Sequence, residues 1–148
     1  MLEIKVALMV SKPVEEVFEA IVDPEKMTNY FISSSTGRME ENETLIWKFP
    51  EFDMEFPVTI GKVERNKYIS WYWDEQDGRE LLVEINLEPV IPSSTLITIS
   101  EKERENDELG IKWLKTNTEG WANFLACLKA YLEFGINLRK GGFDHLKV

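Results

Sequence analysis

The stretch GWANFLACLKAYLEFG, residues 120–135, decides the fold of this chain. Large apolar side chains recur there at steps of three and four residues, which places them on one face of an α-helix: Trp121, Phe124, Leu125, Leu128, Leu132 and Ile136. Tyr131 and Phe134 widen that face, as expected for a helix that lies across a broad surface. The helix either packs on a solid core or closes a hollow, and the spacing alone allows both.

Most of the chain before this helix alternates apolar and polar residues, which is typical of strands. The alternating stretches are 4–10, 44–49, 54–60, 68–73, 81–87 and 95–100. Short turns separate the later stretches, which predicts an antiparallel sheet. Residues 101–108 are mostly charged, and we expect them to form a break before the last helix.

Local chemistry predicts two short helices after the first strand. Ser11 stands two residues before Pro13, so we expect it to cap a helix with the proline in its first turn. Asp23 and Pro24 should restart a second helix over 25–31 by the same logic. Pro57 has no amide hydrogen for a β-ladder, so its strand should be an edge strand or be bulged there.

Composition limits the classes of partner. The formal charge is −10, from 27 acidic and 17 basic residues, which would repel a phosphate backbone and disfavours nucleic acid and anionic membranes. The sequence shows neither a signal-peptide pattern nor an apolar run of about 20 residues, so we expect a cytoplasmic protein without a membrane span. The single cysteine, Cys127, lies on the apolar helix face and is expected to be a small buried hydrophobe.

The residues that usually carry catalysis are scarce. His145 is the only histidine and lies near the end of the chain, where a general base would be poorly positioned. Nucleophile elbows, phosphate loops, dinucleotide fingerprints and clustered Cys and His ligands are absent from the sequence, so we expect no catalytic residue, metal or cofactor. Two carboxylates, Glu55 and Asp74, are candidates to orient a polar ligand group at a cavity mouth. Four others fall on faces that we assign to solvent: Glu84, Glu88, Glu119 and Glu133.

Aromatic residues are the most suggestive feature. Several of them share the strand face that should point at the last helix, where they can fill the space or line an apolar pocket of about 300–1,000 Å³ with an indole N–H or two as polar anchors. Both alternatives remain open at this point. The candidate lining residues are Tyr30, Phe31, Trp47, Phe49, Phe56, Trp71, Trp73, Val83, Trp113, Trp121, Phe124 and Leu128.

Several short motifs, taken in order, resemble the START-like superfamily, also called SRPBCC or birch-pollen-allergen-like. The branch that the chain resembles most is that of the activator of the heat-shock-protein-90 ATPase. The motifs are Val10-Ser11-Lys12-Pro13, Asp23-Pro24-Glu25-Lys26-Met27 running into Tyr30-Phe31, Gly61-Lys62-Val63-Glu64, Ile69-Ser70-Trp71-Tyr72-Trp73 and Gly120-Trp121. The chain departs from the family where a glycine pair often precedes the third strand, since Gly37-Arg38-Met39 stands there.

The resemblance implies one α+β helix-grip domain over residues 1–148, with the tail 141–148 mobile or loosely docked. A curved antiparallel sheet of six to seven strands should wrap around the long C-terminal helix, with two short helices after the first strand. A cavity is expected between sheet and helix, where members of the superfamily bind lipids, sterols, hormones or polyketides. Fold alone does not fix function.

Two functional classes follow. The first is a non-enzymatic binding domain for a small apolar or amphipathic molecule. The alternative is a protein-interaction or chaperone-cofactor module that acts through its acidic outer surface, as a weak homodimer or with another protein. A third class, an enzyme of the cyclase or dehydratase kind known in the superfamily, would need an acid–base pair that the sequence does not place.

Overall fold

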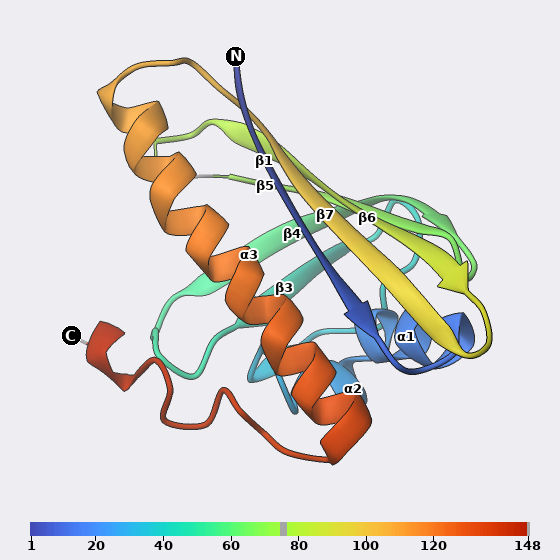
Figure 1. The fold of residues 1–148 in the computed structure, drawn as a ribbon. Helices are drawn as coiled ribbons and strands as arrows, with labels where there is room; N and C mark the ends of the chain where they lie inside the picture. The colour runs from blue at the N-terminus through green and yellow to red at the C-terminus, as the bar shows by residue number, and fades with distance from the viewer. Residues whose placement is uncertain (75–76, 148) are drawn as a thin grey trace.

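The alternating stretches build one antiparallel sheet, crossed on one face by a long helix (Figure 1). This computed structural model describes residues 1–74 and 77–147. The seven strands of its sheet follow the order β1-β7-β6-β5-β4-β3-β2. They are β1 Leu2–Val10, β2 Ser34–Ser35, β3 Thr44–Lys48, β4 Glu55–Glu64, β5 Tyr68–Asp74, β6 Glu80–Val90 and β7 Ser94–Arg104.

The predicted long helix is α3, Glu108–Phe134. Its ends have local causes: Asp107 accepts a hydrogen bond from the Gly110 N–H at 2.8 Å, and Gly135 closes the helix with a left-handed backbone at φ 64°. After Gly135 the chain turns back towards the loop between β3 and β4 (Figure 1). A short 3-10 helix, η1 Asp144–Leu146, lies near its end.

The inner face of the sheet and the apolar face of α3 share one core. Trp121, Phe124 and Leu128 of α3 are buried, as are Trp71 and Ile85 on the sheet. The two short helices, α1 Val14–Val22 and α2 Pro24–Met27, lie together at one end of the sheet (Figure 1). The expected α+β helix-grip architecture is therefore confirmed, including the seven antiparallel strands and the two short helices.

The starts of the short helices differ in part from expectation. Ser11 does not cap α1, because Pro13 occupies the cap position, without a side-chain bond. The Ser11 backbone N–H donates to the Glu133 carboxylate of α3 at 2.9 Å. Asp23 does cap α2, since its carboxylate accepts from the Glu25 N–H at 2.9 Å. However, α2 ends at Met27, and turns complete the path to residue 31.

Pro57 does not mark a bulge, and it lies in an end of its strand that is paired on one side only, as at a sheet edge. Its strand β4 lies between β3 and β5, and the irregularity in β4 falls between Ile60 and Val63. Pro57 lies opposite Ile46, whose backbone N–H and C=O bond to Thr36 on the other side of β3. The pairing with β5 begins only at Thr59. The missing amide hydrogen therefore removes no bond from either ladder.

The charged stretch after residue 100 is only partly a break. β7 continues to Arg104, so the inward alternation Thr95, Ile97 and Ile99 extends to Glu101. The Glu101 side chain is fully buried, at 0% exposure. The expectation that 101–104 form a break was wrong because three N–H groups on other elements satisfy this carboxylate.

Candidate functional site

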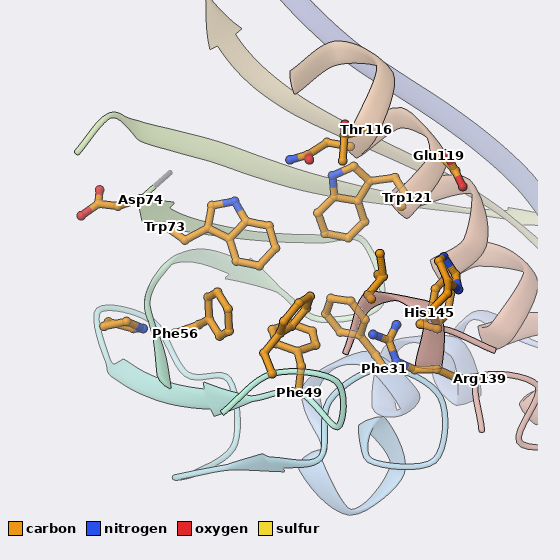
Figure 2. A pocket seen from close by; sticks show the side chains of 16 residues that line it. Phe31, Phe49, Phe56, Trp73, Asp74, Thr116, Glu119, Trp121, Arg139 and His145 are labelled. Carbon is orange, nitrogen blue, oxygen red and sulfur yellow. The ribbon is translucent and has the colours of Figure 1, made fainter. Parts of the chain in front are cut away.

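A cleft of about 470 Å³ opens at one end of the interface between α3 and the sheet (Figure 2). Four parts of the chain surround it: the segment after α2, the β3–β4 turn with β4, the end of β5, and α3 with the C-terminal segment. Its lining residues are Phe31, Phe49, Phe52, Phe56, Pro57, Trp73, Asp74, Thr116, Asn117, Glu119, Gly120, Trp121, Arg139, Phe143, His145 and Leu146.

Aromatic rings in mutual contact form the walls. The Phe49 ring meets Phe31 and Phe56 edge to face, each with ring centroids 5.1 Å apart. Trp73 and Trp121 lie almost parallel, with centroids 5.8 Å apart and planes inclined at 30°. Such contacts hold large rings in fixed positions, so the cleft has a pre-formed apolar surface.

Glu101 anchors the two indoles from behind. Its Oε2 accepts the Trp73 indole N–H at 2.7 Å, and its Oε1 accepts the Trp121 indole N–H at 3.2 Å and the Asn117 side-chain amide at 2.9 Å. An ionised carboxylate accepts on both oxygens and donates on neither, which suits three N–H donors. Glu101 therefore fixes the orientation of both tryptophans, and it consumes their only polar groups.

A buried ion pair closes the other side of the cleft. Arg139, from the segment after α3, bonds through Nη2 to Oε1 of Glu51 in the β3–β4 turn. The side chains of Arg139 and Glu51 are only 14% and 4% exposed. The Arg139 guanidinium also lies over the rings of Phe143, Phe49 and Phe31, at 4.6, 5.7 and 5.8 Å from their centroids. These contacts attach the C-terminal segment to the aromatic wall.

Acidic side chains stand at the edge of the cleft. Asp74 and Glu119 are exposed and lie on opposite sides of the cleft in Figure 2. His145, also exposed, lies beside Arg139 in the same view. A second hollow of about 400 Å³ adjoins the cleft and shares Phe31 and Arg139 with it.

The structure divides the twelve predicted lining residues into two groups. Five of them line the cleft: Phe31, Phe49, Phe56, Trp73 and Trp121. The other seven are buried in the adjoining core and are not part of the cleft wall: Tyr30, Trp47, Trp71, Val83, Trp113, Phe124 and Leu128. The Tyr30 hydroxyl, for example, donates to the Ala20 carbonyl at 2.8 Å, and the Tyr30 ring stacks on the Tyr131 ring.

Of the two carboxylates that the sequence predicted at the cavity mouth, the structure brings one to the cleft. Asp74 lines it, whereas Glu55 does not and pairs with Lys48 at 3.9 Å. Sequence reasoning missed the C-terminal contributors Arg139, Phe143, His145 and Leu146, which it placed in or beside the tail. An arginine four residues before a phenylalanine was the one signal that this segment could dock on an aromatic surface.

The described residues contain neither a metal-binding cluster nor a membrane-spanning helix. No group of three or more His, Cys, Asp or Glu side chains is arranged to hold a metal ion within 1–74 and 77–147. In the same ranges, no helix combines the length and the apolar character needed to cross a bilayer. What this site offers chemically is aromatic surface with carboxylates at its rim.

A sheet that wraps around a long C-terminal helix, with a cleft between them, defines the helix-grip class of the START-like superfamily. The family described as Activator of Hsp90 ATPase homolog 1-like protein matches residues 11–133. The chain belongs to this family. No curated protein sequence matches the chain.

Solved structures agree with this assignment. Protein SSP2350 from Staphylococcus saprophyticus is 34% identical, with a TM-score of 0.80 over 91% of this chain and 94% of that one. The Aha1 dimer from Colwellia psychrerythraea has a TM-score of 0.77 at 18% identity, over 91% of this chain and 98% of that one. DynU16, from the dynemicin biosynthetic locus, has a TM-score of 0.80 at 23% identity, over 91% of this chain and 48% of that one. The last two show the fold alone.

Proposed function

We propose that this protein binds a small apolar or amphipathic molecule in the aromatic cleft, without catalysing a reaction on it. The observation that carries the proposal is the open cleft of about 470 Å³ with five aromatic side chains held by contacts to one another. Its volume lies within the range of about 300–1,000 Å³ typical of small-molecule sites. DynU16, a structural neighbour from a biosynthetic locus, is consistent with a role on small organic molecules.

Gly120 offers a direct way to block the cleft. It lines the cleft on α3, and a Cβ built there would meet no atom within 4 Å, so a large side chain at this position can enter the open space without displacing the core. Ala122, two residues further along the same helix, is exposed and does not line the cleft. Gly120→Phe and Ala122→Phe therefore form a matched pair, one blocking the cleft and one adding the same ring elsewhere.

The test has two steps. Native mass spectrometry of the protein as purified, followed by denaturing extraction, should reveal a co-purifying molecule. Calorimetric titration with the neutral probe 2-naphthylmethanol should show saturable binding, weakened about tenfold or more in Gly120→Phe and unchanged in Ala122→Phe. An empty protein that also fails to bind the probe up to about 1 mM would contradict the proposal, as would equal affinity in both variants.

A second candidate is self-association. The Colwellia psychrerythraea relative of the same fold is a dimer, and Phe134, Ile136 and Leu138 leave exposed apolar side chains where α3 ends, at 67%, 53% and 52% exposure. Exposed apolar groups that gather together are typical of contact surfaces. Sedimentation equilibrium should show a monomer–dimer equilibrium that Ile136→Lys shifts to monomer. A strictly monomeric wild type at about 1 mM would reject this role.

A further inference from the structure

Three side-chain N–H groups on the tryptophan side of the cleft already donate to one carboxylate. The indole N–H groups of Trp73 and Trp121 both donate to Glu101, and the Asn117 amide donates there as well. The two indoles therefore offer a ligand their ring surfaces but not their N–H groups. An aromatic face carries partial negative charge and attracts cations, while it attracts anions poorly.

Among the described residues that line the cleft, Arg139 is the one lysine or arginine, and its charge is already neutralised by a carboxylate. Arg139 is bonded to Glu51, and the Glu51 side chain is 4% exposed. The Arg139 Nε–H has no hydrogen-bond partner among the described residues and can still donate to a ligand. The Glu51 carboxylate nevertheless offsets the attraction of the guanidinium for a ligand anion, and displacing Glu51 would leave that carboxylate buried without its cation. Arg139 itself already rests on three phenylalanine rings, which shows that these walls accept a cation.

Apart from the exposed imidazole of His145, the titratable rim groups without an ion-pair partner among the described residues are acidic. Asp74 and Glu119 line the cleft from β5 and α3, are exposed, and have no ion-pair partner among the described residues. They stand on opposite sides of the cleft (Figure 2). A cationic group at the mouth would therefore meet a carboxylate on either side, whereas an anionic group would be repelled by both.

Building on the proposed binding function, we propose that the cleft selects aromatic ligands whose polar end is cationic, such as an ammonium or guanidinium group, over otherwise similar anionic ones. The ring enters between the phenylalanine and tryptophan walls, and the cation remains at the mouth near Asp74 and Glu119. Specificity arises from the indole N–H groups and the guanidinium charge, which Glu101 and Glu51 already satisfy, and from rim carboxylates that have no ion-pair partner among the described residues.

Three probes that share one ring system test this inference: 2-naphthylmethylammonium, 2-naphthylmethanol and 2-naphthylacetate. A rim carboxylate about 7 Å from the charge of the ligand, in a water-like medium, changes the affinity for that ligand about threefold. Two rim carboxylates should therefore make the affinity for the ammonium probe about tenfold or more higher than that for the acetate probe. Calorimetry at low ionic strength should give the order ammonium, then alcohol, then acetate. At about 1 M salt the difference should shrink, because the Debye length falls to about 3 Å.

A matched pair of variants separates local recognition from the overall charge of −10. Glu119→Gln should lower the affinity for the ammonium probe about threefold relative to its affinity for the alcohol. Glu15→Gln, on the exposed side of α1 and outside the cleft, removes the same charge and should change neither affinity.

Binding of the acetate as tightly as the ammonium would overturn the inference and leave the proposed binding function intact. Equal losses in Glu119→Gln and Glu15→Gln would also overturn it, because selectivity would then come from net charge and not from the cleft. Failure of all three probes, together with an empty purified protein, would reject the binding function and this inference with it.

Discussion

A double-mutant cycle between Glu101 and Trp73 tests the central feature of the site. Oε2 of Glu101 has one hydrogen-bond donor among the described residues, the Trp73 indole N–H at 2.7 Å, whereas Oε1 has two at 2.9 and 3.2 Å. Trp73→Phe removes that donor and keeps an aromatic ring at the position. Glu101→Gln keeps an oxygen for the two donors at Oε1 and turns its amide towards Trp73, so a donor faces a donor.

The coupling energy follows from these contacts. A hydrogen bond to a charged group contributes about 1.5–3 kcal/mol to stability. In the Glu101→Gln background that bond is already absent and Trp73→Phe also removes the donor–donor contact, so the substitution should cost less there by at least about 1.5–3 kcal/mol. The cycle cancels the loss of ring surface and the changed desolvation of residue 101, because both occur on parallel sides of the cycle.

Urea unfolding of the four proteins, followed by circular dichroism at neutral pH, measures the coupling. The matched control is the cycle of Glu101→Gln with Trp113→Phe, because the buried Trp113 indole N–H has no hydrogen-bond partner in the described part of the chain. That cycle should give a coupling energy below about 0.5 kcal/mol. A value this small for the Trp73 cycle would refute the inference that Glu101 holds the indoles.

Three further predictions concern two glycines of α3, the cysteine and a tyrosine of β5. Gly110→Ala should destabilise the protein by about 2 kcal/mol or more in thermal unfolding, because its Cβ would lie 1.9 Å from the Glu105 carbonyl oxygen. Gly120→Ala has open space around its Cβ and should stabilise α3 by about 0.5–1 kcal/mol. Burial raises the pKa of the Cys127 thiol despite the opposing charge of Arg139, so a thiol reagent at neutral pH should modify it slowly until the protein is unfolded in urea. Burial and a hydrogen bond to Glu84 raise the pKa of Tyr68 to about 12 from 10.0. The stabilisation from the protonated phenol is complete below about pH 10 and is lost as pH rises towards 12. The difference in unfolding free energy between wild type and Tyr68→Phe should therefore shrink across that window. A constant difference would contradict the raised pKa of Tyr68.

The sequence predicts α3 well because its determinants are local. The spacing of Trp121, Phe124 and Leu128 sets the buried face, and Asp107 and Gly135 set the ends within a few residues of the helix itself. The strands follow for the same reason, since alternation is a property of neighbouring residues. The alternation did not predict the two-residue strand β2, and it ended β4, β6 and β7 too early. In β7 the mistake begins at one residue, Glu101.

Glu101 illustrates why a candidate site is harder to predict than a fold. A glutamate after a β-branched strand normally marks its exposed end, because a buried carboxylate needs donors. Here the donors are 28, 16 and 20 residues away, on β5 and α3. Their convergence depends on the register of β5 and on the rotation of α3, which no local pattern records. The same holds for Arg139 and Glu51, which are 88 residues apart.

The two alternatives that the aromatic residues left open occur along different lengths of the same helix. Around Phe124 and Leu128 the interface with the sheet is solid, with both side chains at most 1% exposed. One to two turns earlier, α3 carries only the short side chain of Thr116 and no side chain at Gly120. The cleft opens at these two positions. The tryptophan rings continue across this boundary, since Trp121 contacts rings on both the core side and the cleft side. The hollow thus arises from missing volume on α3 opposite rings that Glu101 prevents from collapsing inward, which is why Gly120→Phe should close the cleft while leaving the core packed.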